Sequence, residues 1–151
     1  MPRSPSIRLG SGGFTLLELA TVLLLMSLSL GCLLPGARRQ LDRVAVLEAR
    51  EELAGLFHRA RLEAVAFGGA TVLLNSDSAS ATLVTGGEVL DRTALLEKYS
   101  VSLTLSAGRP EAELTFDSLG LGRVASQTLR LKRGDAEAAL VVSSFGRIGR
   151  K

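Results

Sequence analysis

The chain has 151 residues, a hydrophobic content of 46% and a formal net charge of +3 at pH 7. This length has room for one modest domain and a targeting segment. Five Phe, one Tyr and no Trp leave little material for stacking the bases of single-stranded nucleic acid, and a single cysteine excludes an intramolecular disulfide. No cluster of Cys or His has the spacing of a metal site, so the sequence predicts no metal, no cofactor and no enzymatic activity.

Residues 1–13 contain two prolines and three glycines and show no hydrophobic periodicity, which is typical of a flexible leader. The leader carries Arg3 and Arg8 and no acid, so the rest of the chain has 16 basic and 15 acidic residues. A net charge of +1 outside the leader is weak evidence for a polyanionic partner.

An apolar run extends from Phe14 to Leu34 and is interrupted by one carboxylate, Glu18. As a helix with about 1.5 Å per residue, this run is long enough to cross the roughly 30 Å hydrocarbon core of a bilayer. Arg3 and Arg8 precede it, which predicts a cytoplasmic N-terminus and a translocated C-terminal part, although Arg38 and Arg39 beyond the run weaken that charge bias.

The order Gly13-Phe14-Thr15-Leu16-Leu17-Glu18-Leu19 at the head of this run resembles the class III signal of type IV pilins and of the pseudopilins of type II secretion. The resemblance implies that a prepilin peptidase cuts between Gly13 and Phe14 and methylates the new N-terminal phenylalanine. It also implies that Glu18, five places into the processed chain, pairs with the free amine of an adjacent subunit during filament assembly.

Two other targeting signals compete with this interpretation. An ordinary secretory signal or signal anchor also has a basic start and an apolar core, but Glu18 inside the core argues against it. The sequence Ser29-Leu30-Gly31-Cys32 has the ending of a lipoprotein signal, with Ser29 where leucine is usual, so a lipid anchor at Cys32 is a less favoured alternative.

Helical periodicity resumes after Pro35, which predicts a single long helix over 14–67 with a kink near residue 35. One stripe of this helix is apolar and is expected to face a sheet: Val46, Ala49, Leu53, Leu56, Phe57, Ala60, Ala64 and Phe67. Val44, Leu47, Leu62 and Val65 lie almost opposite. They are either scattered surface residues or a face that contacts neighbouring subunits.

Gly68-Gly69 is expected to end the helix, and the remainder, 68–151, has the period of short strands. The predicted strands are Ala70–Leu74, Ala81–Thr85, Glu88–Arg92, Tyr99–Leu105, Glu113–Phe116, Gln127–Lys132 and Ala138–Ser143. The predicted fold is therefore α+β, a long N-terminal helix packed on an antiparallel sheet of about six or seven strands.

Three features of this part lend themselves to a chemical interpretation, and each has a simpler one. His58 is the single histidine, and we interpret it as a solvated helix residue. Asn75 and Asp77 could offer oxygens to calcium but are typical turn formers. The stretch from Gly120 to Ala125 matches a dinucleotide fingerprint, yet it precedes a strand rather than a helix, so we interpret it as a loop.

The tail, from Phe145 to Lys151, places three cations, Arg147, Arg150 and Lys151, in the last five residues. Together with Phe116–Arg123 it resembles the end of the H-type minor pseudopilins, the GspH/FimT-like family. In FimT-like proteins a basic tail is tied to DNA binding, and here the spacing departs from the Gly-Arg-x-Arg pattern. Contacts of these three cations to phosphates would give weak, salt-sensitive binding, and a strand edge blunted by charge is the simpler interpretation.

These observations together predict a minor pseudopilin of type II secretion, a structural subunit of the inner membrane with a periplasmic domain. The partners implied by the resemblance are other pseudopilins through their N-terminal helices, the prepilin peptidase and membrane lipid. The alternative is a FimT-like minor pilin that binds DNA for uptake.

Overall fold

A computed structural model describes residues 15–123 and 126–151, without the side chains of 32–34 and 107. The chain divides into two compact units, Met1–Ala37 and Arg38–Lys151. Helix α1 (Leu16–Phe67) begins in the first unit and continues into the second, with Pro35 inside it. The predicted cleavage site lies outside the described residues.

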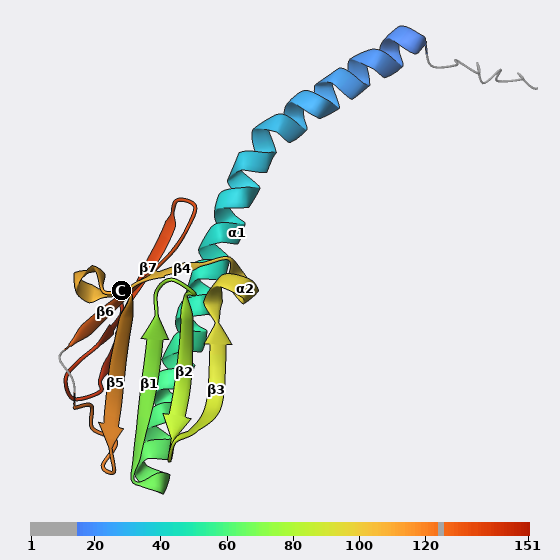
Figure 1. Ribbon diagram of the computed structural model, residues 1–151. Coiled ribbons are helices and arrows are strands. Elements are labelled where there is room, and N and C mark those ends of the chain that lie inside the picture. Colours follow the sequence, from blue (N-terminus) through green and yellow to red (C-terminus); the bar gives the residue numbers. More distant parts are fainter. Residues whose placement is uncertain (1–14, 124–125) are drawn as a thin grey trace, which may run out of the picture. The chain divides into compact units, whose positions relative to one another are not determined.

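The described part of the second unit contains α1 from Arg38 onward, a short α-helix, one 3-10 turn and eight strands. These elements are β1 (Gly69–Asn75), β2 (Ser80–Thr85), β3 (Glu88–Ala94), α2 (Leu95–Tyr99), β4 (Ser102–Thr104), η1 (Ser106–Gly108), β5 (Glu111–Asp117), β6 (Gln127–Arg133), β7 (Ala136–Val142) and β8 (Ile148–Arg150). Figure 1 shows the first three strands and β5 side by side in front of α1.

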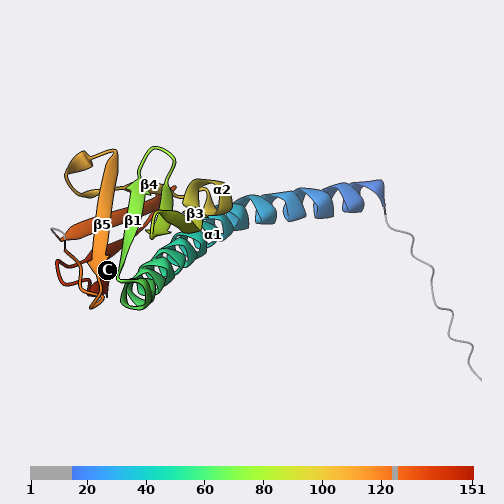
Figure 2. The same cartoon turned by 60° about the horizontal axis from the view of Figure 1, so that its bottom comes forward.

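The strands form two antiparallel sheets where the sequence predicted one. The first has the order β3-β2-β1-β5 and the second β4-β6-β7-β8, and the strands of the second run at an angle to those of the first (Figures 1 and 2). After β3, helix α2 redirects the chain, so β4 pairs with β6 and places Leu103 opposite Leu131. Alternation along a strand determines its buried face but not its neighbour, which is why the sequence did not reveal two sheets.

The core joins α1 to both sheets. The predicted stripe of α1 is buried from Val46 to Ala64 and packs with β residues such as Val72, Leu114 and Leu140. Phe57 and Phe116 meet edge to face, with their ring centroids 6.4 Å apart. The α+β fold, with a long N-terminal helix and antiparallel strands, is thereby confirmed.

Two details of the predicted elements are wrong. Phe67 is 69% exposed because it is the last helical residue and the chain turns at once through Gly68, whose φ is +84°, into β1. Tyr99 belongs to α2 and not to a strand, because Leu95, Leu96, Glu97 and Lys98 favour a helix. Strand β8 was not among the seven predicted strands, although a strand edge blunted by charge was the simpler interpretation of this tail.

Candidate functional site

The described part of the N-terminal motif is the start of α1. Thr15 precedes the helix, and its Oγ1 accepts a hydrogen bond from the backbone N–H of Glu18 at 3.2 Å. Thr15 is therefore the N-cap, and Glu18 occupies the third helical position, as in the sequence pattern of a capping box. The spacing Thr-x-x-Glu carries this signal in the sequence, beside the charge of Glu18.

The helix beyond Glu18 exposes its apolar side chains throughout the described part of the first unit. Its most apolar 18-residue window has a mean hydropathy of 2.1 and none of it is buried, so by length and composition this helix could cross a membrane. The hydroxyls of Thr21, Ser27 and Ser29 donate to backbone carbonyls three or four residues earlier. Hydroxyls satisfied within the helix suit a medium without water.

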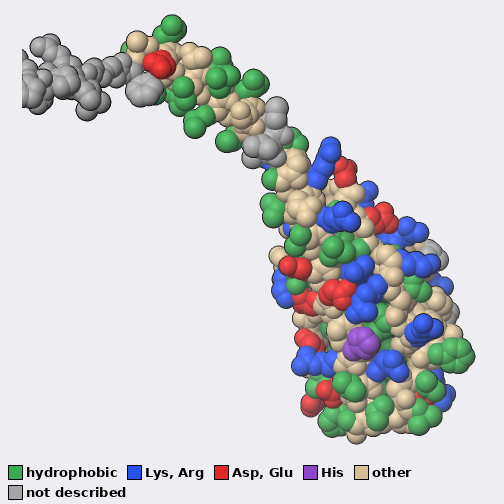
Figure 3. All heavy atoms as spheres, turned by 180° about the vertical axis from the view of Figure 1, so that it is seen from behind, with side chains coloured by type: hydrophobic (Ala, Val, Ile, Leu, Met, Phe, Trp, Pro, Cys, Tyr) green, Lys and Arg blue, Asp and Glu red, His purple; other side chains and the backbone are tan. Residues whose placement is uncertain are grey.

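Figure 3 displays this composition directly, since green side chains dominate the segment and one acidic side chain stands near its start. The sequence identifies that acid as Glu18, the one charged residue between Phe14 and Leu34. The side chain of Cys32 lies outside the described residues, so the lipid-anchor alternative has no structural test. Helix α1 is assigned without interruption through Pro35, and the kink there stays a prediction.

A second feature is the apolar outer face of α1 within the second unit. Leu62 and Val65 are 72% and 58% exposed, and they share a hollow of about 240 Å³ with Leu119 of the β5–β6 loop. Arg61 ties that loop to the helix by donating from Nε to the carbonyl oxygen of Gly120 at 3.0 Å. The sequence placed Leu62 and Val65 on this face but did not indicate that Leu119, 74% exposed, would join them.

The loop that carries Leu119 is fixed by one carboxylate. Asp117 Oδ1 accepts hydrogen bonds from the backbone N–H groups of Leu121 and Leu119 at 2.9 and 3.0 Å. The Leu121 hydrogen bond is the largest influence on this carboxyl and, with the other bonds, holds the pKa of Asp117 below its ordinary value despite some burial. The apolar side chains of the loop are thus presented by an ordered turn.

The C-terminal tail forms an edge strand rather than a cluster of free cations. Strand β8 pairs with β7, and Arg150 binds Glu51 of α1 through its Nε at 3.0 Å. Glu51 also pairs with Arg50, and hydrogen bonds from Arg150 and then Arg50 keep the pKa of Glu51 below its ordinary value. Among the described residues, Arg147 and Lys151 make no ion pair.

The described residues hold no group of three or more His, Cys, Asp or Glu side chains that could bind a metal ion. His58 is exposed on α1. Asn75 uses its Oδ1 to accept from the N–H and hydroxyl of Ser78, which is the role of a turn former and leaves calcium no favoured site there. Residues 118–123 form a turn and loop, as predicted.

The comparisons with known proteins agree with this architecture. Residues 49–146 match the family model "Type II transport protein GspH". No curated protein sequence matches the chain.

Two solved structures have a similar fold. The type IV minor pilin FimU of Pseudomonas aeruginosa matches with a TM-score of 0.54 at 19% identity, over 70% of this chain and 91% of that one. The minor pseudopilin EpsH of the Vibrio cholerae type 2 secretion system matches with a TM-score of 0.50 at 16% identity, over 73% of this chain and 95% of that one. At these identities the likeness concerns the fold.

Proposed function

Because the chain belongs to the GspH family of type II transport proteins, we propose that it is a minor pseudopilin that is cut after Gly13 and built into a short periplasmic filament. Phe14–Leu34 anchors the subunit in the inner membrane before assembly, with the N-terminus in the cytoplasm and residues 38–151 in the periplasm. The observation that carries this proposal is a single carboxylate, Glu18, at the head of an exposed helical segment, 16–30, that is otherwise uncharged.

Glu18 has the central role in assembly. A carboxylate buried among apolar helices without a partner costs several kcal/mol, on the order of 3–5, and pairing with a cation recovers much of that cost. Cleavage at Gly13 frees an amine at Phe14, and the amine of an adjacent subunit supplies that cation. This pairing sets the axial register between subunits.

Glu18 stands at the third helical position, where a Glu or Gln side chain is able to accept from the N-cap backbone N–H, so two variants are needed to separate that role from charge pairing. Gln keeps an oxygen for such a contact but has no charge, whereas Ala loses both. We expect Glu18→Gln and Glu18→Ala to be inserted and folded and to enter filaments poorly, as measured by pulldown of partner pseudopilins and by secretion. Normal assembly of Glu18→Gln would show that charge pairing is not the role of this residue.

The cleavage step is tested by mass spectrometry of the native N-terminus. We expect a chain that begins with methylated Phe14, and we expect Gly13→Ala to be cut slowly and Gly13→Val not at all, because the peptidase must reach the scissile carbonyl. A chain that begins with a lipid-modified Cys32 would overturn the proposal in favour of a lipoprotein.

The outer face of α1 is proposed to contact neighbouring subunits in the filament. Leu62 and Val65, with Leu119 beside them, offer an apolar surface that the described fold does not cover. A cysteine at position 62, in a chain with Cys32→Ala, should crosslink to another pseudopilin in assembled filaments. Crosslinks confined to its own chain would contradict this contact.

A second candidate function, DNA binding in a FimT-like minor pilin, rests on Arg147 and Lys151, whose exposed side chains form no ion pair with any residue that the structure describes. Arg150 contributes less because Glu51 already holds it. Salt-sensitive retardation of a DNA duplex by the detergent-solubilised chain, lost in Arg147→Gln/Lys151→Gln, would favour uptake over secretion.

A further inference from the structure

The side of the first sheet that points away from the core carries a row of acids. Leu114 and Phe116 of β5 are buried, so the alternation of the strand places Glu111, Glu113 and Asp117 on the opposite, outer side. Figure 1 looks onto this outer side, since α1 lies behind the strands. We call the surface that Glu111, Glu113 and Asp117 form along this edge strand the acidic face.

The carboxylates of the acidic face differ in what already holds them. Asp117 binds Arg123 at 3.3 Å, so its charge is compensated. Glu111 accepts a hydrogen bond from Nδ2 of Asn75 at 3.1 Å, and this neutral amide leaves its charge in place. Glu113 is exposed and makes no hydrogen bond or ion pair with any described residue. Glu111 and Glu113 are therefore open to the cations of another molecule.

Apolar side chains lie beside these acids on the same side of the sheet. Leu73, which is opposite Glu113 on β1, is 44% exposed, and Val89 on β3 is 64% exposed. Arg92 shares this side but stands on β3, which β2 and β1 separate from β5. The acidic face thus combines carboxylates with apolar surface that the described fold does not cover.

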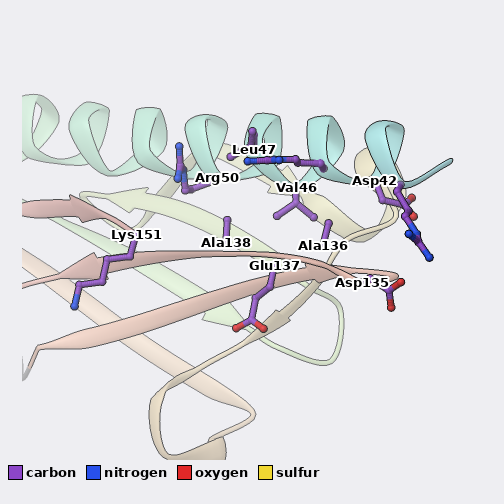
Figure 4. A pocket seen from close by; sticks show the side chains of 11 residues that line it. Asp42, Val46, Leu47, Arg50, Asp135, Ala136, Glu137, Ala138 and Lys151 are labelled. Atoms are coloured by element: carbon purple, nitrogen blue, oxygen red, sulfur yellow. The ribbon is translucent and has the colours of Figure 1, made fainter. Parts of the chain in front are cut away.

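The outer side of the second sheet has the opposite charge. The two leucines of β6 are buried, so Arg130 and Lys132 point outward. Lys151 exchanges both backbone hydrogen bonds with Ala139 of β7, and Figure 4 shows its side chain pointing away from α1. Glu137 points the same way and pairs with Arg130 at 2.9 Å, whereas Lys132 and Lys151 make no ion pair within the described residues. We call the surface of Arg130, Lys132 and Lys151 the basic face.

The charges of the two faces have the same spacing. Glu111 and Glu113 are two residues apart on β5, and Arg130 and Lys132 are two residues apart on β6, so each pair spans about 7 Å along its strand. Two copies of the same face repel each other. A contact between unlike faces instead brings two carboxylates opposite two cations.

We propose that the acidic face of one copy of this chain binds the basic face of another copy. Glu113 and Lys132 form the central ion pair, and Leu73 packs on the aliphatic stem of that lysine. Because the two faces differ, the contact is heterologous, and a row of copies keeps one free face of each kind at its ends. The contact goes beyond the proposed function, since it requires neither Glu18 nor cleavage after Gly13.

The size of the two faces predicts a weak contact. Four strands about 4.8 Å apart, each of seven residues at about 3.3 Å, cover at most about 440 Å². Two such faces together remain below the roughly 1,600 Å² that a standard stable interface buries. An exposed ion pair changes an association constant by about 1.5- to 5-fold and is screened by salt. We therefore expect the contact to form where copies are held at high local concentration.

Chemical crosslinking tests this contact in the concentrated full chain with Cys32→Ala, in a neutral detergent at low salt. The first copy carries Leu73→Cys, beside Glu113, and the second carries Thr104→Cys, opposite Arg130 on β4. Packed sheets lie about 10 Å apart, so the reagent is a bismaleimide of that span. We expect the two kinds of copy to crosslink to each other about tenfold faster than either does to its own kind, because like faces repel.

Charge reversal identifies the partner of each face. Glu111→Lys/Glu113→Lys in the first copy should lower the crosslinking rate about tenfold, because two attractive pairs become repulsive. Arg130→Glu/Lys132→Glu in the second copy should lower it by a similar factor. The two reversals together should restore the rate, since each reversed face again meets its opposite charge. Salt at about 0.5 M should slow the crosslinking of unreversed copies.

The matched control is Glu48→Lys/Glu97→Lys, which changes the net charge equally at two exposed carboxylates on α1 and α2 and should leave the rate unchanged. Circular dichroism of each variant establishes that it is folded. Equal crosslinking of like and unlike copies would mean random collision, and an unrestored rate in the doubly reversed mixture would mean that the two faces do not meet. An effect of the basic reversal without one of the acidic reversal would assign the basic face to another anion. Each of these results overturns the proposal.

The outcome is separable from that of the proposed function. A chain that is cut after Gly13 and enters filaments, yet gives no crosslink between unlike faces, refutes this contact and leaves the proposed pseudopilin function intact. A chain that is not cut but crosslinks as expected refutes the proposed processing and leaves the contact in place.

Discussion

Glu52 links two helices that are far apart in sequence. From the middle of α1 it accepts hydrogen bonds from the ammonium of Lys98, at 2.6 Å, and from the hydroxyl of Tyr99, both in α2. Its side chain is 27% exposed, so these bonds are partly shielded from water. The short helix α2 thereby gains a fixed position that its five residues could not provide alone.

This contact predicts how the stability of the protein depends on acid. Burial raises the pKa of Glu52, but the hydrogen bonds from Lys98 and Tyr99 outweigh it and hold the pKa below its ordinary value of 4.5. A carboxyl whose pKa is lower when folded stabilises the fold above its unfolded pKa and loses that contribution as the pH falls through the folded value. Glu51 and Asp117, whose pKa values are also lowered, act in the same direction.

We therefore expect Glu52→Gln to lose about 1 kcal/mol of unfolding free energy at pH 7 and to show a shallower loss than the wild type below about pH 5. Urea denaturation followed by circular dichroism, repeated across that pH range, measures both effects. Glu113→Gln removes an exposed carboxylate for which no hydrogen bond or ion pair is found, and it serves as the control. Parallel pH curves for Glu52→Gln and the wild type would contradict the role of this carboxylate.

At the scale of single residues, the sequence predicted which side chains are buried better than it predicted which side chains pair with one another. The burial of Val46, Ala49 and Leu53 follows from spacing on a helix, and the structure confirms it. The pairing of Arg150 with Glu51, 99 positions away, depends on where β8 is placed beside α1, and no local pattern encodes that.

At the scale of elements, two loops are held together by glycines. Gly122 follows β5 and Gly146 lies between β7 and β8, where its φ is +75°. A Cβ on Gly122 would lie 2.9 Å from the nitrogen of Gly146, and one on Gly146 would lie 2.9 Å from Cε1 of the buried Phe116. Because Gly122 lies close to Gly146, and Gly146 lies close to Phe116, both loops pack against the core.

Gly146→Ala should therefore lower the unfolding free energy by about 1–3 kcal/mol, since it adds both a left-handed backbone strain and a clash. The matched control is Gly55→Ala, in the exposed part of α1 with no atom within 4 Å of the new Cβ, which should gain up to about 1 kcal/mol. Thermal unfolding of the two variants measures the contrast. A neutral Gly146→Ala would mean that the two loops are free to separate.

The long helix and seven of the eight described strands were predictable as elements, because their apolar periods and flanking turns are local. Helix α2 was hidden because five residues are too short for a period to show. Strand β8 has no predicted bounds, because the pattern Ile-Gly-Arg alternates too briefly to locate a strand, although its charges indicated a strand edge. The division into two sheets depends on long-range pairing, which alternation along one strand does not specify.

At the scale of the whole molecule, the two units differ in whether their apolar side chains are buried or exposed. Every buried hydrophobic residue of the described chain lies between Ala45 and Val142, so the core belongs to the second unit. The described apolar residues between Leu16 and Leu30 are all exposed. The core that stabilises the fold therefore lies in the second unit, whereas the described part of the first unit exposes an apolar helix.

This division predicts that residues 38–151 fold without the N-terminal segment. We expect that fragment to be soluble without detergent and to unfold in one cooperative transition, whereas the full chain should aggregate unless detergent or lipid covers its apolar helix. The measurements are thermal circular dichroism and gel filtration.

A fragment 54–151 is the contrast, because it lacks Val46, Ala49 and Leu53 together with the Glu52 link to α2. Each lost core residue costs about 2–5 kcal/mol against a typical stability of about 5–15 kcal/mol, so this shorter fragment should show no cooperative transition. If it unfolded as cooperatively as 38–151, the first turns of α1 in the second unit would not be part of the core, and the helix would serve assembly alone.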